Sequence, residues 1–186
     1  YNQNSQTLKE QMSPRKETVN YVVIDDARFV EACRLYFLWK DLNNAIKTQT
    51  SRGINIPDVI TEQMVCWALD LRWNRGSVGG DATDNAGSLI EIKATSNYNR
   101  DLSSFSPNTH FDRLIFFRLN QSANTADIYD LGLNGNSFQA LRVNNTQTVA
   151  AQQRLGRRPR LSLIDYINAQ QIAPICQIDI VARTKR

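Results

Sequence analysis

Hydrophobic residues recur at helical spacing in the first third of the chain. Asp25 and Asp26 can cap a predicted helix over 27–47, whose apolar positions are Phe29, Val30, Cys33, Phe37, Trp39 and Leu42. We expect this helix to pack into the core, with a dimer surface as the alternative for its aromatic residues. After a break at Arg52 and Gly53, Pro57 predicts the start of a second helix running to about Trp73, with one apolar stripe at Ile60, Met64, Trp67 and Leu71.

From Gly80 the hydrophobic period changes from about 3.6 to 2. In the segment 88–95, Ile90, Ile92 and Ala94 share one face, and Leu89, Glu91, Lys93 and Thr95 share the other. The residues at 84–87 are typical of a turn. The pattern therefore predicts a hairpin that pairs 79–83 with 88–95.

The rest of the chain alternates between apolar runs and polar loops. A polar loop at 97–110 precedes 113–119, a nearly continuous apolar run typical of a central strand. Further predicted elements are strands at 126–131 and 137–143 joined through Asn134 and Gly135, a short helix from Thr146 to Gln153, a helix at 161–169 and a strand at 175–181. Together these elements predict one mixed α/β (α+β) domain over 1–186, a central mixed β-sheet flanked by helices, with 1–20 as a flexible or surface arm.

Composition indicates a globular protein, because 41% of the 186 residues are hydrophobic and 22% are charged. No apolar run approaches the roughly 20 residues that cross a bilayer, and the first residues lack the pattern of a secretory signal. The three cysteines are too few and too widely spaced for a disulfide framework or a zinc site. We therefore expect a soluble cytoplasmic protein with no membrane partner.

The candidate chemistry lies on the predicted hairpin. Gly80 and Asp81 are followed, after nine residues, by the triplet Glu91-Ile92-Lys93. Asp81 falls opposite Ile90 or Glu91, depending on the length of the loop, and Glu91 and Lys93 share a strand face. Two adjacent carboxylates suit Mg²⁺, with the Ile92 carbonyl as a further ligand, and Lys93 can orient or deprotonate an attacking water. The simpler alternative is a surface hairpin with a weak Glu–Lys ion pair.

Two other acids are close to this motif in sequence. Glu62 lies on the largely apolar side of the second predicted helix and could line the metal site, although a partly exposed helix residue is the alternative. Asp84 is a rival first ligand, but its position in the turn favours a structural role.

Arginines outnumber lysines 16 to 6 in a chain of net charge +4. Arg154, Arg157, Arg158 and Arg160 lie within seven residues with no acid between them, on a segment that Gly156 and Pro159 predict to be a loop. Such a cluster can contact phosphates or read guanine edges, although a solvated charge run is the simpler interpretation. The loop that follows the predicted strand at 88–95 adds polar candidates for DNA contact at Asn97, Asn99, Arg100 and Ser104.

Other reaction classes lack their residues. His110 is the only histidine, which excludes a histidine-rich metal site. The glycine-rich segment 76–80 is not followed by the lysine of a phosphate-binding loop, so we expect no nucleotide cofactor.

The segments Gly80-Asp81-Ala82 and Glu91-Ile92-Lys93-Ala94-Thr95 resemble the PD-(D/E)XK nuclease superfamily, and most of all its type II restriction endonucleases, with Gly80 in place of the proline of the textual pattern. Three stretches, 37–43, 101–107 and 156–161, are also similar to small restriction enzymes that cut GCNGC.

This resemblance implies a restriction-endonuclease-like core, with Asp81 and Glu91 as metal ligands and Lys93 as the base that orients water. It also implies Mg²⁺-dependent hydrolysis of double-stranded DNA to 5′-phosphate ends, by a bacterial enzyme of a restriction–modification system acting as a homodimer on its site. A repair or junction-resolving nuclease and a non-catalytic DNA-binding module remain alternatives.

Overall fold

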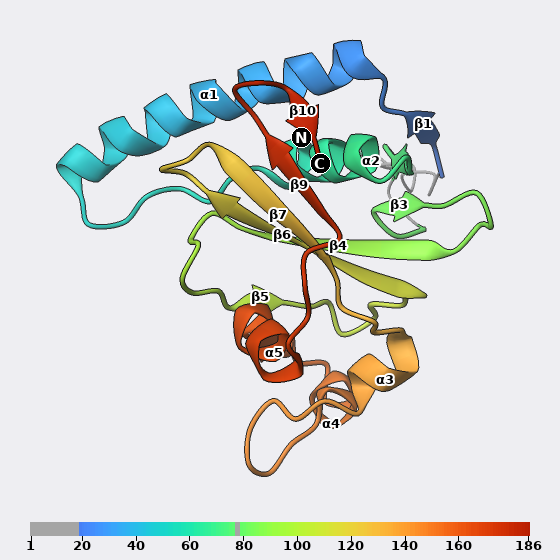
Figure 1. Cartoon of the computed structure of the whole chain (residues 1–186). Helices are drawn as coiled ribbons and strands as arrows, with labels where there is room; N and C mark the ends of the chain where they lie inside the picture. The colour runs from blue at the N-terminus through green and yellow to red at the C-terminus, as the bar shows by residue number, and fades with distance from the viewer. Residues whose placement is uncertain (1–18, 77–78) are drawn as a thin grey trace, which may run out of the picture.

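The computed structural model describes residues 19–76 and 79–186. Its centre is an eight-stranded sheet in the order β1-β2-β3-β4-β6-β7-β9-β10, in which β4 and β6 are parallel and the other neighbouring pairs are antiparallel (Figure 1). The strands of the sheet are β1 (Tyr21–Val23), β2 (Arg72–Asn74), β3 (Ala82–Thr83), β4 (Leu89–Thr95), β6 (Arg113–Asn120), β7 (Thr125–Asp130), β9 (Cys176–Asp179) and β10 (Thr184–Lys185).

Helices cover both faces of this sheet. On one face lie α1 (Asp26–Gln49) and α2 (Asp58–Ala68), and on the other lie α3 (Gly135–Gln139), α4 (Val149–Arg154) and α5 (Leu163–Gln170), together with a small second sheet of β5 (Ser103–Ser104) and β8 (Arg160–Leu161) (Figure 1). This is the predicted mixed sheet flanked by helices, consistent with a restriction-endonuclease-like core.

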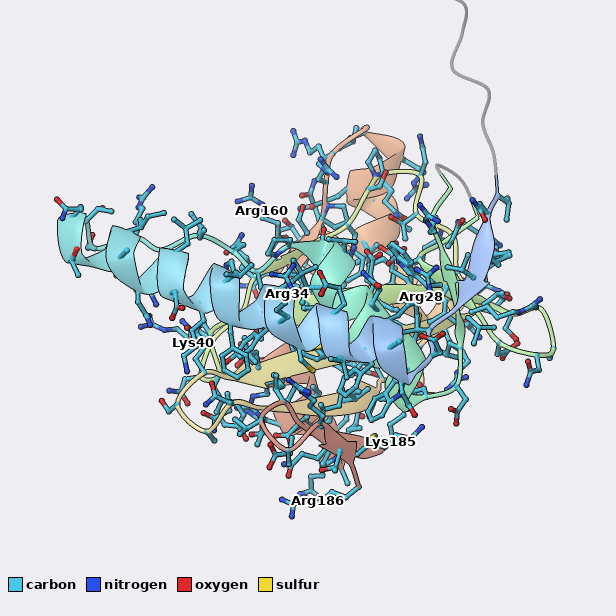
Figure 2. The ribbon with its side chains drawn as sticks, turned by 90° about the horizontal axis from the view of Figure 1, so that it is seen from above. Arg28, Arg34, Lys40, Arg160, Lys185 and Arg186 are labelled. Atoms are coloured by element: carbon cyan, nitrogen blue, oxygen red, sulfur yellow. The ribbon has the colours of Figure 1, made fainter. Side chains whose placement is uncertain are left out.

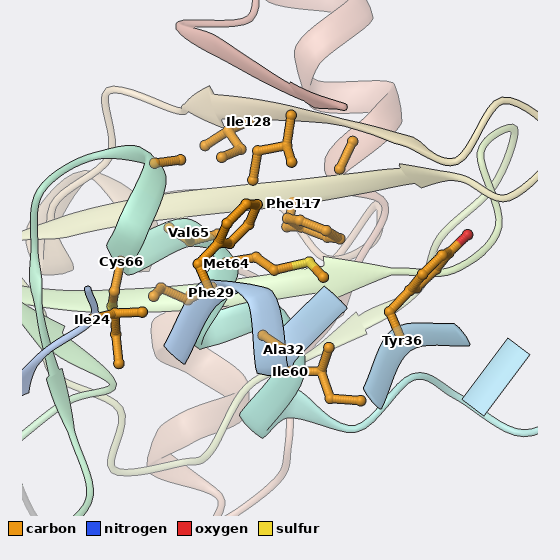
Figure 3. Close-up of a cluster of buried hydrophobic side chains, with 14 of the residues drawn as sticks. Ile24, Phe29, Ala32, Tyr36, Ile60, Met64, Val65, Cys66, Phe117 and Ile128 are labelled. Atoms are coloured by element: carbon orange, nitrogen blue, oxygen red, sulfur yellow. The ribbon is translucent and has the colours of Figure 1, made fainter. Parts of the chain in front are cut away.

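Two hydrophobic clusters hold the layers together. The larger packs α1 and α2 against the sheet and includes Phe29, Tyr36, Met64, Phe117 and Ile128, all at most 1% exposed (Figure 3). The smaller packs α3, α4 and α5 on the opposite face. β6 contributes to both clusters, which explains why its sequence is almost continuously apolar and confirms the predicted central strand.

The predicted second helix is too long. α2 ends at Ala68, Asp70 adopts a left-handed backbone with φ of 54°, and Arg72–Asn74 forms β2 between β1 and β3. Leu71 is buried as predicted, but from the segment after the helix. Its apolar spacing continued the helical pattern by coincidence.

The predicted strand at 137–143 is wrong. Asn134 is the N-cap of α3, since its side chain accepts from the Ser137 amide while the Asn134 amide donates to Ser137 Oγ. This reciprocal capping stabilises a helical turn, and Phe138 then packs against Phe105 and Phe111. Asn134 and Gly135 therefore start a helix rather than a hairpin turn.

The first helix is confirmed, with Asp25 as its N-cap, but its apolar residues do not share one face. Phe29 and Trp39 are buried, whereas Val30, Phe37 and Leu42 are 37%, 37% and 54% exposed. The helix therefore packs into the core as expected, but through only some of its apolar residues.

The remaining predictions differ mainly at the ends of elements. The short helix is capped by Thr148 instead of Thr146, and the predicted helix at 161–169 begins at Leu163. The hairpin pairs only two residues of β3 with β4, and β1 and β10 were not predicted. The predicted arm at 1–20 lies largely outside the described residues. No helix in the described part of the chain is long and apolar enough to cross a membrane.

Candidate active site at the open edge of the catalytic strand

The carboxylate of Asp81 lies against the backbone of β4. The pairs Ala82↔Ile90 and Thr83↔Leu89 set a register that, extended by one residue, brings Asp81 level with Glu91. At that point the ladder changes, because the Asp81 amide donates to the Ile90 carbonyl (3.0 Å) and the Asp81 carboxylate accepts from the Ile92 amide (Oδ2···N 2.7 Å). The side chain of Asp81 thus takes the place of a paired strand beside Ile92.

This edge of β4 is open beyond Ile90. In the described residues, β3 pairs with Leu89 and Ile90 alone, while the other edge of β4 is covered by β6. The N–H and C=O of one strand residue point to the same side of the strand. Since the Ile92 amide points toward Asp81, the Ile92 carbonyl faces the open edge as well.

Glu91 and Lys93 form an ion pair on the adjoining face of β4. Their Oε1 and Nζ atoms are 2.6 Å apart, and the side chains are 13% and 24% exposed, respectively. Lys93 Nζ also lies 5.3 Å from the centre of the Phe105 ring. The ammonium is therefore sheltered from solvent and held beside the carboxylates.

Glu62 reaches the same place from α2. Its Oε2 accepts a hydrogen bond from Trp73 Nε1 on β2 (2.7 Å), which fixes the carboxylate between helix and sheet. Burial raises the pKa of Glu62, and the bond from Trp73 opposes that shift. The structure thus brings Glu62 together with Asp81, Glu91 and Lys93.

The pKa values of the cluster show how strongly its charges interact. Burial and the neighbouring charges of Glu91 and Glu62 raise the pKa of Asp81 to about 7. Burial disfavours the ammonium of Lys93, but Glu91 and Asp81 outweigh this effect and raise its pKa. Crowded carboxylates at this site would be relieved by an added cation.

These side chains line a cavity of about 720 Å³. Its lining includes Glu62, Asp81 and Glu91. The other lining residues come from segments 74–89 and 106–110: Asn74, Gly76, Gly79, Gly80, Leu89, Ser106, Asn108, Thr109 and His110. The cavity therefore joins β4 to the loop at 97–110.

The donor atoms at this edge fit a cation that keeps part of its water shell. Among the described residues, no group of three or more His, Cys, Asp or Glu side chains could hold a metal ion. Asp81, Glu91 and the Ile92 carbonyl offer oxygen atoms alone, which matches the preference of Mg²⁺ for a few protein oxygens and several waters. The residues present fit Mg²⁺ and not a transition metal that requires nitrogen or sulfur.

The arginine cluster, defined as Arg154, Arg157, Arg158 and Arg160, is connected to this site through β5. Arg160 on β8 pairs with Ser104 on β5, and the Phe105 amide donates to the Pro159 carbonyl (3.0 Å). Phe105 is the ring beneath Lys93. The end of the cluster at Arg160 therefore lies beside Ser104, the residue before the phenylalanine that contacts Lys93.

All four arginine side chains are exposed, and none forms an ion pair with another described residue. Figure 2 shows Arg160 projecting away from the ribbon. The predicted loop is only partly correct, because Arg154 ends α4 and Arg160 belongs to β8. The cluster presents unpaired positive charge to solvent.

Asp101 fixes this arrangement. Its carboxylate accepts from the Ser103 and Ser162 hydroxyls and from the Leu163 and Ile164 amides at the start of α5, at 2.8–3.1 Å. It thereby joins the loop after β4 to the segment that follows Arg160.

The other predicted DNA contacts lie at the far end of β4. Asn97, Asn99 and Arg100 are exposed, and their loop is held by Thr95 Oγ1, which bonds the carbonyls of Asn97 and Arg100. Asn97 and Arg100 line a second hollow beside Asp58. Ser103 lines the same hollow, and its neighbour Ser104 pairs with Arg160 of the arginine cluster.

Sequence reasoning missed Trp73, Asn74 and Asp101. Asn74 bonds the Gly80 carbonyl (2.8 Å) and so holds the segment before Asp81. No local pattern marks these residues, because each acts on a segment distant in sequence. The turn acid Asp84 accepts from the Ala86 and Ser88 amides, as its predicted structural role requires.

Comparisons with known proteins place the chain in a family. The family model for the Bsp6I restriction endonuclease matches residues 24–169. The type II restriction enzyme Bsp6I of Bacillus sp. (strain RFL6) is 46% identical over 169 residues, which cover 90% of this chain and 95% of that protein. No solved structure gives a significant match.

Proposed function

The chain belongs to the Bsp6I restriction endonuclease family and is a type II restriction endonuclease, and on this premise we propose how it cleaves double-stranded DNA. Asp81 and Glu91 hold Mg²⁺, Lys93 orients the attacking water, and the arginine cluster contacts a short GC-rich palindrome, with GCNGC as the proposed site. The observation that carries this assignment is the Asp81 carboxylate bonded to the amide between Glu91 and Lys93.

Mg²⁺ would be held by the carboxylates of Asp81 and Glu91 and by the Ile92 carbonyl. When bound, the ion neutralises charge on the scissile phosphate and makes water more acidic. The raised pKa of Asp81 supports this assignment, since a cation would favour the ionised carboxylate. Glu62 supports the site from α2, with its orientation fixed by Trp73.

Lys93 acts as an ammonium. Its raised pKa keeps it protonated at neutral pH in the metal-free protein, which favours donating a hydrogen bond over removing a proton. Nζ can then orient the water and stabilise the negative charge that builds on the phosphate oxygens. Attack of the water on phosphorus breaks the bond to the 3′-oxygen and leaves a 5′-phosphate and a 3′-hydroxyl.

The arginine cluster supplies the contacts that select the sequence. A guanidinium can donate two hydrogen bonds to a guanine edge, worth about 1–3 kcal/mol of discrimination per base pair. Ser104 lies directly beside Arg160, and Asn97, Asn99 and Arg100 add contacts nearer the end of β4. A GC-rich site matches this excess of exposed arginine.

A palindromic site has two equivalent strands, and we propose that a homodimer cleaves both. The sheet draws strands from Tyr21 to Lys185, which supports treating 1–186 as a single nuclease domain. A DNA substrate and a bacterial relative support a cytoplasmic location in a bacterial cell.

The test is digestion of unmethylated plasmid DNA with Mg²⁺ or with EDTA, followed by sequencing of the cut ends. Discrete fragments ending at GCNGC with 5′-phosphates support the proposal. Nicks at structural junctions would indicate a repair nuclease, and DNA that is shifted but intact would indicate a binding module. Cleavage in EDTA would contradict the requirement for Mg²⁺.

Lys93→Ala tests the site itself. The variant should bind the same DNA with little change and cleave about 10²–10³ times more slowly, since it loses a group that stabilises charge in the transition state. Lys47→Ala is a matched control, an exposed lysine at the end of α1 that should cleave normally. A normal rate for Lys93→Ala would refute the assignment.

A further inference from the structure

α1 carries two apolar faces. One enters the core, and the opposite face carries the residues at positions 27, 30, 34, 37, 38, 41, 42 and 45, spaced by one, three or four as neighbours on a helix surface are. Leu38 and Leu42 on that outer face are each 54% exposed, and Val30 and Phe37 are each 37% exposed. A helix that only covers a core needs one such face.

The outer face is open in the described structure. α1 lies on the outside of the molecule, above the sheet in Figure 1 and in front of the rest of the chain in Figure 2. Its buried contacts, made by Phe29, Tyr36 and Trp39, all lie on the opposite side. In the described residues, the outer apolar side chains therefore lie on an exposed surface, together with Arg34 and Asp41, that is open to a partner.

Charge places a constraint on that partner. Arg34 and Asp41 are the charged residues nearest the middle of the face, and both are exposed. In an antiparallel pair of α1 helices centred between Phe37 and Leu38, each Arg34 lies opposite Asp41 of the other copy, and Phe37 meets Leu38 at the axis. The face is thus complementary to itself in charge and in apolar character.

The same register is favourable beyond the centre. Val30 then faces Ala45, and Ala27 faces Thr48, so small and apolar side chains meet along the helix. Arg28 and Lys47, which would come level with each other, lie off the face, since 100° per residue turns each of them more than a quarter-turn away. No like-charged pair therefore opposes this packing.

We propose that the outer face of α1 is an isologous dimer interface, in which two copies of this chain pack their α1 helices antiparallel with Arg34 opposite Asp41. This deepens the homodimer of the proposed function by assigning its surface. It does not depend on cleavage, because the interface forms without DNA. α1 is about 36 Å long, which suits a modest interface at the low end of the range for stable dimers.

The test measures self-association in the absence of DNA. Sedimentation equilibrium of the full chain should show a monomer–dimer equilibrium. Arg34→Asp and Asp41→Arg each place like charges opposite each other twice in a homodimer, and each should weaken dimerisation about tenfold or more. Arg28→Glu reverses an exposed charge off the face and is the matched control, expected to dimerise as the unmodified chain does.

Mixing the two variants is the decisive step. In a heterodimer of Arg34→Asp with Asp41→Arg, both facing pairs are again of opposite charge, so the mixture should dimerise more tightly than either variant alone. Loss of the ion pair between Arg34 and Glu31 (2.7 Å) within one helix cannot be repaired by mixing. Circular dichroism and thermal unfolding check that each variant is folded.

Three outcomes would overturn the proposal: a chain that stays monomeric at about 100 μM without DNA, single variants that dimerise normally, or a mixture that shows no recovery. A chain that dimerises through α1 but does not cut plasmid would leave this interface intact and refute the proposed function. A chain that cuts discrete sites but is a monomer in solution would refute this interface and leave the proposed function intact.

Discussion

The Asp81 carboxylate accepts a hydrogen bond from the Ile92 amide, with Oδ2 and N 2.7 Å apart. Ile92 stands between Glu91 and Lys93, so this one bond holds Asp81, the residue before β3, against the strand that carries the other two groups. It exists because β3 begins only at Ala82, opposite Ile90, and so leaves the Ile92 amide without a strand partner on that edge. The break in the ladder therefore builds the site.

Asp81→Asn should stabilise the metal-free protein while abolishing cleavage. The pKa of Asp81 is raised from 3.8 to about 7, so the stability linked to its protonated form is complete below pH 4 and is lost as the pH rises through 7. Asparagine does not ionise, so the variant should keep its stability as the pH rises. Above pH 7 it should be more stable than the unmodified chain, by at most about 4 kcal/mol. Urea unfolding in EDTA at several pH values measures the difference.

The control for this titration is Asp84→Asn, which should behave in the opposite sense. Hydrogen bonds from the Ser88 backbone lower the pKa of Asp84, so its contribution is present at neutral pH and is lost as the pH falls. Equal pH profiles for Asp81→Asn and the unmodified chain would show that the Asp81 carboxylate is not crowded as described.

Trp73→Phe should shift the pH dependence of cleavage. The variant removes the donor to Glu62, and the pKa of that carboxyl should rise further because the hydrogen bond no longer opposes the effect of burial. We expect the acid limb of the rate profile to move to higher pH and the rate at neutral pH to fall about tenfold, as for other residues that orient a metal site.

Trp67→Phe is the matched control, since Trp67 Nε1 donates to Asp26 at the start of α1, away from the cluster. If Trp73→Phe gives the same rate profile as this control, Glu62 has no part in cleavage.

Alanine substitution in the arginine cluster should separate contacts to phosphates from contacts to bases. Replacing an arginine that contacts a phosphate should weaken binding to all sequences and reduce the slope of log K against log salt by about 0.9. Replacing an arginine that reads a base should instead reduce discrimination at one position of the site by about 1–3 kcal/mol. Binding titrations over a range of salt concentrations, with cognate and substituted sites, measure both effects.

Arg28→Ala is the control, an exposed arginine on α1. If all four cluster variants bind DNA as this control does, the cluster is a solvated charge run.

Asp101→Ala should destabilise the protein and weaken DNA binding together. Its carboxylate accepts from two hydroxyls and from the first amides of α5, and losing this cap should cost about 2–4 kcal/mol. Because Asp101 also holds the ends of β5 and β8, the arginine cluster should lose its position. Chemical unfolding and DNA affinity are the measurements.

Asp165→Ala removes an exposed acid in the first turn of α5 and should cost less than about 1 kcal/mol. Normal DNA affinity in a folded Asp101→Ala variant would show that the position of the cluster does not depend on this cap.

The sequence alone determined the elements whose signals are local. The alternation around Ile90 and Ile92 predicted β4, the acids at Asp25 and Asp26 predicted the start of α1, and Asp81 with Glu91 and Lys93 predicted the candidate site. The two elements and the shared placement of the three side chains agree with the structure, because strand alternation, helix capping and side-chain spacing depend on residues a few positions apart. The catalytic roles of the three residues stay predictions. The local pattern at 137–143 fitted both a strand and a helical turn, and the prediction of a strand there was wrong.

Only the tertiary structure decided which atoms meet. The register that places Asp81 on the Ile92 amide depends on the strand that β3 leaves unpaired, and Trp73 reaches Glu62 because the chain turns at Asp70 after α2. Which side of α1 is exposed could not be predicted from the sequence, because both faces of the helix carry apolar residues. Whether a face is buried depends on the segments that pack against it. A helical pattern indicates which residues share a face but not which face the fold covers.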